Sequence, residues 1–342
     1  MRPNNSQAGL RQIADEAGVS LATASLVLRG KDKSSEATRQ RVRDVAERLR
    51  YRPNLLVQGM QTGRTATVGV VVPIVGYFAL VSHGIYERLA ESGYLPVFHY
   101  QTEDTKEDGR AKELSIIHRL LGQRVDGIIM CPADESVSDL YFSEVWERGI
   151  PLVAVDRLLG MTHADFVGTD DLAGGRLAAE HLLSLGHRRL AQVAGGFDLG
   201  PFNARRTAFS QTVREAGATC VDVELVEPNY ADAVQRLLSL DPLPTGVFLA
   251  SDNCAPDLYA EARVRGIEIP RDLSVVGFAG LPWSEFLVPP LTTLDQSPHL
   301  VGREAAEILL SRIESGIDNY EPKKVRIVPE LIQRKSTDRP SR

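Results

Sequence analysis

The sequence is poor in cysteine and has no long apolar run. Cys131, Cys220 and Cys254 are its only cysteines, and they lack the CxxC spacing of a zinc knuckle. A disulfide framework is therefore not expected, and a reducing cytoplasm fits this composition. No apolar stretch reaches the length that spans a membrane, and the first residues, MRPNNSQAGLRQ, lack the apolar core of a secretory signal. We expect a cytoplasmic protein without a membrane partner.

Common catalytic and metal-binding motifs are also absent. The sequence contains no GxSxG, no Walker loop and no HExxH. The glycine-rich segment VAGGFDLG, residues 193–200, does not fit the GxGxxG pattern. His181 and His187 are six residues apart, on different faces of a helix, which does not suit a metal pair. The sequence thus predicts no enzyme, no metal and no cofactor.

Charge is distributed unevenly along the 342 residues. The formal net charge is −6, but residues 1–64 hold 12 Lys and Arg against 6 Asp and Glu, so the remainder is strongly acidic. The length and the hydrophobic fraction of 43% predict two or three domains with buried cores. A basic head on an acidic body indicates that only the head meets a polyanion; a chance excess of surface Lys and Arg is the alternative.

The segment IADEAGVSLATASLVLRG, residues 13–30, predicts two short helices joined by a tight turn. Leu10, Ile13, Ala14 and Ala17 have helical spacing, Gly18 can end the helix with a positive φ, and Ser20 can cap the next one. The second helix covers residues 21–28, and a third covers residues 35–49. Three short helices around one core predict a helix-turn-helix, with an ordinary three-helix bundle as the alternative.

In a helix-turn-helix the second helix enters the major groove with its N-terminus leading. The residues predicted to face the bases are Ser20, Leu21, Ala22, Thr23 and Ser25. Arg29 and Lys33 follow and can reach phosphates.

The segment LRYRPNLLVQGMQTGRT, residues 49–65, predicts a further short helix. Pro53 stops the third helix, Asn54 can cap the new one, and Gly63 can end it. With IADEAGVSLATAS and TRQRVRDVAERLRYRPN, this segment resembles the lactose-repressor/galactose-repressor (LacI/GalR) family of bacterial transcription regulators. The resemblance implies a hinge helix that forms on operator DNA, pairs with its dimer mate and places an apolar side chain, here Met60, in the minor groove.

Two features of the head depart from the family pattern. Gly59 weakens the hinge helix by about 1 kcal/mol relative to alanine. Leu21 and Ala22 stand where many relatives carry polar side chains, and they can touch only thymine methyl groups. We therefore expect specificity to depend more on Arg29 and the hinge.

From Thr67 onward, strands and helices alternate. Apolar runs such as TVGVVVP read as buried parallel strands, and the βαβ repetition predicts parallel sheets with helices on both faces. Two units of similar size predict two doubly wound lobes whose strand ends face a common cleft. This α/β body resembles the family in order, through GGRLAAEHLLSLGHRRLAQVAG, NARRTAF, ASDNCA, LSVVGFAG and PPLTTLDQ.

The resemblance also implies domain boundaries for an all-α head and a two-lobed, periplasmic-binding-protein-like α/β body. The head covers residues 1–53, the hinge helix 54–65 and the effector-binding and dimerisation body 66–342. Lobe one covers about 66–167 and 293–319, and lobe two covers about 168–292 and 320–337.

Side chains near the strand ends are the candidate effector contacts. Tyr77 and Phe78 can stack on a ring, Asp156 can accept hydrogen bonds from hydroxyls beside Arg157, and Arg205 stands where the family has its cleft arginine. Each also has a structural alternative, namely core packing, capping or ion pairing. The remaining candidates are Asp252, which could instead cap a helix, Trp283, which could pack between the lobes, and Gln296.

One departure in the body concerns the effector. After VVGF the family usually has an Asp that grips hydroxyl groups, whereas this sequence has Ala279 and Gly280. The missing carboxylate argues against a plain hexose and leaves other sugars or sugar-like molecules.

The family resemblance implies a repressor that binds a palindromic operator in double-stranded DNA as a homodimer. An effector that closes the cleft would reorient the first lobes and change whether the hinge helices meet. No leucine heptad follows VPELIQRKST, so a tetramer built on a C-terminal coiled coil is not expected. A periplasmic solute-binding protein and an enzyme on the same fold are the alternatives.

Overall fold

The structure is a computed structural model that describes residues 9–28, 32–51, 64–74, 76–101, 106–133, 139–159, 164–194, 200–224, 230–316 and 321–341. The chain divides into two compact units, Met1–Thr65 and Ala66–Arg342. The sequence-predicted hinge helix lies almost wholly outside the described residues, together with Arg29, Asn54 and Met60. None of the described helices is long and apolar enough to cross a membrane.

The described residues of the first unit form three short helices around one core. They are α1 (Leu10–Ala17), α2 (Leu21–Leu28) and α3 (Glu36–Arg48), close to the bounds that the apolar spacing predicts. Gly18 takes a left-handed conformation with φ 63° and ends α1, and the Ser35 hydroxyl accepts a hydrogen bond from the Thr38 N–H at the start of α3. The side chains that meet in the core are Ile13, Ala14, Ala17, Ala24, Val27, Val42, Val45 and Ala46.

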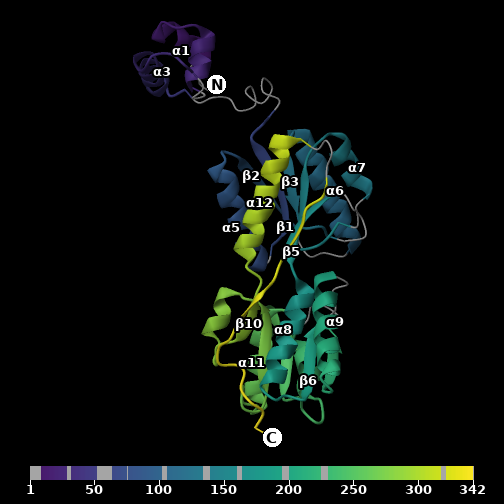
Figure 1. Cartoon of the computed structure of the whole chain (residues 1–342). Helices are drawn as coiled ribbons and strands as arrows, with labels where there is room; N and C mark the ends of the chain where they lie inside the picture. Colours follow the sequence, from purple (N-terminus) through teal and green to yellow (C-terminus); the bar gives the residue numbers. More distant parts are fainter. Residues whose placement is uncertain are drawn as a thin grey trace, which may run out of the picture. The chain divides into compact units, whose positions relative to one another are not determined.

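The second unit consists of two six-stranded sheets, each covered by helices (Figure 1). The first sheet has the order β11-β5-β4-β3-β1-β2 and the second the order β12-β10-β9-β8-β6-β7. The first sheet is parallel throughout, and the second is parallel except where β12 pairs with β10. The strands of the first sheet are β1 (Thr67–Pro73), β2 (Leu95–Gln101), β3 (Gly127–Met130), β4 (Leu152–Val155), β5 (Asp165–Thr169) and β11 (Lys324–Ile327). Those of the second are β6 (Arg189–Ala194), β7 (Thr219–Glu224), β8 (Gly246–Leu249), β9 (Ser274–Ala279), β10 (Thr292–Asp295) and β12 (Glu330–Ile332).

The helices connect these strands in the βαβ order that the sequence predicts. Those of the first lobe are α5 (Gly76–Glu91), α6 (Lys106–Gln123), α7 (Asp139–Glu147) and α12 (Pro298–Ser315). Those of the second lobe are α8 (Asp171–Ser184), α9 (Gly200–Glu215), α10 (Tyr230–Leu238), α11 (Ala255–Val264) and the 3-10 turns η1 (Asp252–Cys254) and η2 (Pro282–Phe286).

Two lobe boundaries differ from the sequence-based ones. β10 pairs with β9 and therefore belongs to lobe two, so the second crossing follows Asp295 rather than preceding residue 293. β11 pairs with β5 and belongs to lobe one, so the third crossing lies between Ile327 and Glu330 rather than near residue 320. In both cases the hydrogen bonds of the last strands, which the sequence alone does not reveal, decide the assignment.

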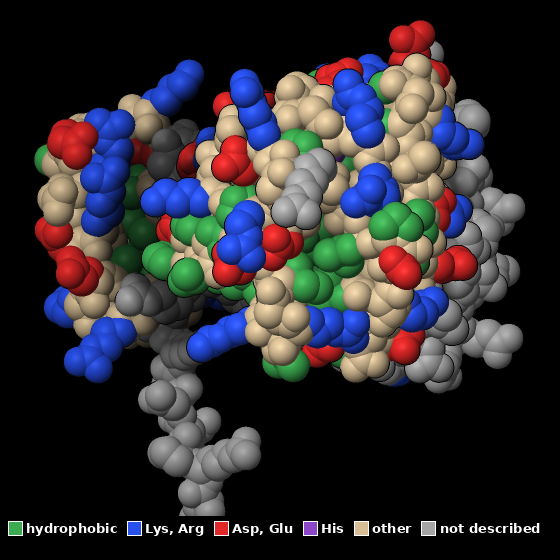
Figure 2. Space-filling view, turned by 90° about the horizontal axis from the view of Figure 1, so that it is seen from below, with side chains coloured by type: hydrophobic (Ala, Val, Ile, Leu, Met, Phe, Trp, Pro, Cys, Tyr) green, Lys and Arg blue, Asp and Glu red, His purple; other side chains and the backbone are tan. Residues whose placement is uncertain are grey.

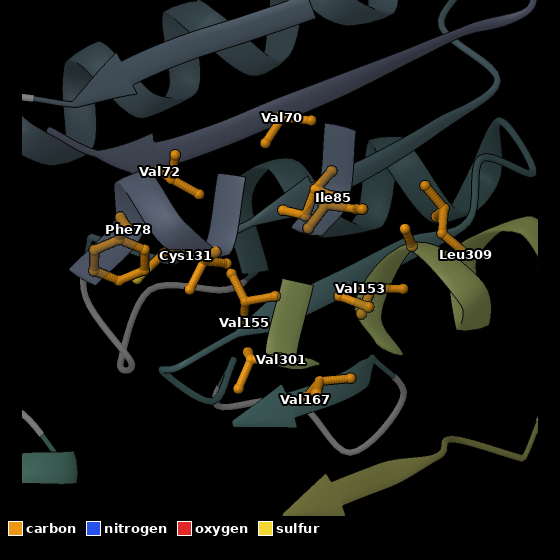
Figure 3. Close-up of a cluster of buried hydrophobic side chains, with 14 of the residues drawn as sticks. Val70, Val72, Phe78, Ile85, Cys131, Val153, Val155, Val167, Val301 and Leu309 are labelled. Carbon is orange, nitrogen blue, oxygen red and sulfur yellow. The ribbon is translucent and has the colours of Figure 1, made fainter. Parts of the chain in front are cut away.

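Helices cover both faces of each sheet. In β1, Val68, Val70 and Val72 pack with α5 and α12, whereas Val71 packs on the other face with α6. This alternation follows from the pleat of a strand. Figure 3 shows Val70, Val72, Val153, Val155 and Val167 of the sheet converging with Ile85 of α5 and Leu309 of α12.

The helices α5 and α12 lie side by side on one face of the first sheet (Figure 1). Gly84 of α5 lies against the His299 carbonyl oxygen of α12, and Gly302 of α12 lies against the Val81 carbonyl oxygen of α5. A Cβ atom at either glycine would overlap the facing backbone. The two helices therefore touch through their backbones.

Candidate DNA-binding surface and inter-lobe cavity

The N-terminal end of α2 presents an exposed face. The Ser20 hydroxyl accepts a hydrogen bond of 3.0 Å from the Thr23 N–H, which is the N-cap that the sequence predicts. Ser20 and Ala22 are exposed and Leu21 is 51% exposed, whereas Ala24 is buried against the other helices. The first turn of α2 thus offers one large apolar side chain and two small ones to a partner.

The other predicted DNA contacts that the structure describes are Thr23 and Ser25 of α2 and Lys33 after it. Thr23 and Ser25 are half-buried, and Lys33 is exposed. The hydroxyls of Ser20 and Thr23 lie 2.9 Å apart, so they hydrogen-bond to one another. Only the donor's proton is used in this bond, so the accepting hydroxyl can still donate to a base edge.

The surface of the molecule carries both signs of charge. On the face that Figure 2 shows, Lys and Arg side chains are interspersed with Asp and Glu side chains. The excess of basic residues belongs to residues 1–64, as the sequence indicates.

A cavity lies between the two lobes of the body and is lined from both. We call it the inter-lobe cavity; its lining comprises Tyr77, Phe78, Asp156, Arg157, Phe202, Arg205, Tyr230, Ser251, Asn253, Phe278, Ala279, Leu281 and Gln296. Asp156, Ala279 and Gln296 lie at or directly after the last residue of a strand. This is the place where ligands of doubly wound sheets bind, beyond the carboxyl ends of the strands. Six of the eight sequence-predicted effector contacts are among the lining residues.

Arg205 of α9 is held by a buried ion pair. Its Nε donates to Asp171 Oδ1 at 2.7 Å and its Nη1 donates to the Ala250 carbonyl oxygen at 2.9 Å. The guanidinium carbon lies 3.9 Å from the centre of the Phe278 ring. These contacts fix the plane of the guanidinium, and Nη2 has no hydrogen-bond partner within the described part of the chain.

Two carboxylates share the surroundings of this arginine. Burial raises the pKa of Asp171 to about 6, although the Arg205 guanidinium opposes the shift. Burial also raises the pKa of Asp156, against the Arg157 and Arg205 guanidinium groups. Asp156 adopts a left-handed backbone conformation with φ 64° directly after β4. Such a conformation is uncommon outside glycine and often marks a functional position.

Tyr77 at the start of α5 contributes a buried hydroxyl. The residue is 9% exposed, and its hydroxyl makes no hydrogen bond of good geometry to the described residues, although the Thr169 side chain lies close enough to lower its pKa. Burial and the nearby Asp156 carboxylate raise the pKa of Tyr77 well above its usual value. Its ring meets Phe78 edge-on, with 5.0 Å between the ring centres. A buried hydroxyl without a well-formed hydrogen bond beside a cavity is what a polar ligand would satisfy.

Gln296 lies at the second crossing between the lobes. Its Nε2 donates to the Thr169 hydroxyl at 3.0 Å, and both side chains are buried. Because Thr169 ends β5 at the first crossing, this bond ties two inter-lobe connections together next to the cavity.

Asp252 and Trp283 do not line the cavity. Asp252 is fully buried, and its two carboxylate oxygens accept hydrogen bonds from the Thr293 hydroxyl at 2.7 Å and the Leu281 N–H at 3.0 Å. It thereby links the ends of β8, β9 and β10, and burial raises its pKa to about 6. Trp283 packs against the apolar core of lobe one, which is the structural alternative.

Sequence reasoning missed several lining residues. Ser251 and Asn253 flank Asp252 in the segment ASDN, and Ser251 rather than Asp252 caps the following turn. Phe278 is the aromatic residue of VVGF and presents its ring to Arg205. Phe278 lies near the end of β9, and its position was the signal that could have found it, whereas Phe202 of α9 and Tyr230 of α10 lie in the first turns of helices.

Both units of the chain match families of known proteins. Residues 9–54 match the family described as bacterial regulatory proteins, lacI family, and residues 179–337 match the periplasmic binding protein-like domain. The chain thus combines a head that matches the lacI family of bacterial regulatory proteins with a body that matches a periplasmic binding protein-like domain. This is a helix-turn-helix head followed by a two-lobed α/β body.

Three known proteins illustrate the likeness. The HTH-type transcriptional repressor PurR of Actinobacillus pleuropneumoniae is 28% identical over 337 residues, which cover 96% of this chain and 98% of that protein. A solved structure of the transcriptional regulator CelR with cellobiose has 29% identity and a TM-score of 0.68, and covers 96% of this chain and 99% of that chain. The Lac repressor dimer bound to operator and the anti-inducer ONPF has 23% identity and a TM-score of 0.83 over 96% and 99% of the two chains, and it shares the fold.

Proposed function

We propose that this protein is a LacI-family repressor that binds a palindromic operator as a homodimer and is controlled by a small molecule in the inter-lobe cavity. The first turn of α2, with Ser20, Leu21 and Ala22, contacts base edges, and Lys33 contacts phosphates. A protein that works on operator DNA acts in the cytoplasm, and we propose this location for it. It acts by binding rather than by catalysis.

The inter-lobe cavity carries the proposal of effector control. Groups from both lobes meet there: Tyr77 and Asp156 from lobe one, and Arg205 from lobe two. A ligand that contacts both lobes stabilises one relative arrangement of them. DNA affinity then changes only by the ratio of the ligand's affinities for the two arrangements.

The chemistry of the lining favours a sugar or sugar derivative. The Nη2 group of Arg205 can donate to hydroxyls, Asp156 can accept from them, and the rings of Phe78 and Tyr230 offer apolar faces. A relative of similar length, CelR, has been solved with cellobiose. The lining has no carboxylate at residues 279–280, so we propose an effector other than a plain hexose.

The first prediction tests the effector. Screening sugars, sugar phosphates and nucleosides by thermal shift should yield a ligand that stabilises the folded protein. At a concentration of 100 times its dissociation constant, the ligand should raise the free energy of unfolding by about 2.7 kcal/mol. Tyr77→Phe should weaken the binding of that ligand by about 1 kcal/mol or more, because the variant loses a hydroxyl that would hydrogen-bond to the ligand. The fold should tolerate the change, since the hydroxyl makes no hydrogen bond of good geometry to the described residues.

Tyr259→Phe is the matched control. It also removes a buried tyrosine hydroxyl, but Tyr259 packs in the second lobe outside the cavity lining. A ligand that responds equally to both variants would not occupy the inter-lobe cavity. A ligand that is turned over during the screen would favour an enzyme instead.

The second prediction concerns the operator. Selection of binding sites from random double-stranded DNA by the full chain should recover two inverted half-sites, because a symmetric dimer reads a palindrome. Base pairs that face Leu21 and Ala22 should show preference for thymine, whose methyl group an apolar side chain can contact. A strong guanine preference there, or a single unrepeated half-site, would count against the proposal.

A further inference from the structure

Two histidines and a glutamate converge where α5 and α12 meet. His83 and Glu87 lie one turn apart on α5, and His299 lies in the first turn of α12. His299 Nε2 is 2.8 Å from Glu87 Oε2, and His83 Nε2 is 3.5 Å from Glu87 Oε1. One nitrogen of each histidine and a carboxylate oxygen all lie within 4.8 Å of one another. These three residues are here called the His-Glu-His cluster.

The cluster is held in place by the glycine contacts between the two helices. His83 immediately precedes Gly84, and His299 is the residue whose carbonyl oxygen touches Gly84. Because the helix backbones are in contact at this point, the main chain fixes the distance between the two helices that carry the histidines. The imidazole centres are 5.4 Å apart. A preorganised donor set costs little ordering entropy when an ion binds.

The charges around the cluster permit a cation. The neighbouring Arg303 lies 3.7 Å from Glu87 but makes shorter contacts, at 3.0 and 3.2 Å, with both oxygens of Glu91. Arg88 pairs with Glu307 and Glu91. The three glutamates outnumber the two arginines, so the local formal charge is −1 when the histidines are neutral. A solvated divalent ion can enter, because the side chains of His83, Glu87 and His299 are 60%, 39% and 45% exposed.

We propose that the His-Glu-His cluster is a binding site for a divalent transition-metal ion of the Zn²⁺ type. Two imidazole nitrogens and one carboxylate oxygen are ligands that zinc accepts, with water in the fourth position. Mg²⁺ and Ca²⁺ prefer all-oxygen sites and should not compete. On binding, the Glu87–His299 hydrogen bond gives way to two bonds to the metal.

A metal at this position would join α12 to α5 close to the inter-lobe cavity. His299 comes three residues after Gln296, which lies at the second crossing, and α5 begins beside Tyr77, which lines the cavity. The ion would therefore fix the helix that starts where the chain re-enters lobe one. This role is independent of which effector the cavity takes.

The test is titration of the metal-free, tag-free full chain with Zn²⁺ alone, by calorimetry. We expect saturable binding of one ion per chain. Each of His83→Asn, Glu87→Gln and His299→Asn should weaken this binding at least about tenfold, since each removes a ligand. His118→Asn is the control, because His118 is likewise exposed and lies 3.4 Å from Glu144 but belongs to no three-ligand group among the described residues.

Co²⁺ provides a second readout that does not depend on heat. Visible absorption that saturates at one equivalent and disappears in the three variants would support the site, because metal geometry sets the spectrum. Melting temperatures in chelator should be the same for all four variants, which separates loss of a ligand from loss of fold. Absence of stoichiometric binding, or binding that only His118→Asn weakens or that none of the variants changes, would overturn the proposal.

Discussion

The ion pair between Arg205 and Asp171 is the residue-scale feature on which the inter-lobe cavity depends. Both side chains are buried, and Arg205 is further held by the Ala250 carbonyl group and the Phe278 ring. Removing either partner of a buried ion pair leaves the other charge uncompensated and costs about 3–5 kcal/mol. Arg205→Ala is therefore a poor probe of ligand contact, whereas Tyr77→Phe changes the cavity without breaking a pair.

The third prediction follows from the raised pKa of Asp171. A folded-state pKa of about 6 exceeds the ordinary value of 3.8, so between these pH values the folded protein binds more protons than the unfolded one. This group's contribution to the free energy of unfolding therefore falls as pH rises from about 4 to 6, by about 3 kcal/mol at most, and is constant above pH 6. Asp171→Asn should lower stability overall and should reduce this slope in urea unfolding measured from pH 4 to 8, leaving the share of Asp252, whose pKa is also raised to about 6.

Asp257→Asn is the control for that measurement. Asp257 is an exposed carboxylate in the first turn of α11, so its replacement should leave the pH profile as it is. If Asp171→Asn and Asp257→Asn gave profiles with the same slope between pH 4 and 6, the assignment of that slope to Asp171 would be wrong.

At the scale of elements, the contact between α5 and α12 leaves no room for a side chain at Gly84 or Gly302. The fourth prediction is that Gly84→Ala or Gly302→Ala lowers the free energy of unfolding by about 1–3 kcal/mol or more, because the new methyl group overlaps a facing carbonyl oxygen and the helices must separate. Gly122→Ala, in α6 and exposed, meets nothing within 4 Å. It should leave stability unchanged or raise it by up to about 1 kcal/mol, and equal effects at all three sites in urea unfolding would contradict the argument.

Sequence patterns predicted most elements because their signals are local. The apolar spacing from Leu10 to Ala17 and the glycine at residue 18 suffice for α1, and the apolar run at residues 67–73 suffices for β1. The strand β11 was missed as part of lobe one because its half-exposed sequence KVRI says nothing about which edge it joins. Asp252 was expected in the cavity because it follows β8, but the partners that turn it inward, Thr293 and Leu281, are remote in sequence.

At the scale of the whole molecule, charge separates the two units. Residues 1–64 carry the net positive charge, and the body carries the negative charge. DNA affinity should therefore fall steeply with salt, since phosphate contacts release counterions. The sequence of the body has an excess of acidic residues and should not contribute to phosphate binding in this way.

The fifth prediction measures this effect at one residue. Lys33→Ala should weaken operator binding uniformly across sequences and reduce the slope of log affinity against log salt by about 1, if Lys33 contacts one phosphate. Lys335→Ala, an exposed lysine of the body, is the matched control and should change neither quantity. Fluorescence anisotropy at several salt concentrations measures both, and an unchanged slope for Lys33→Ala would remove Lys33 from the DNA-binding surface.

The way the chain passes between the lobes has a consequence for biosynthesis. In the described strands, β11 is the outer neighbour of β5 in the first sheet, and β12 is the outer neighbour of β10 in the second. Each sheet therefore receives its last strand from residues 324–332. During translation neither lobe can be completed until these residues have left the ribosome. Until then both sheets expose an unpaired edge, the kind of surface through which nascent chains associate wrongly. Folding of the body is therefore expected to finish only after residues 324–332 have emerged.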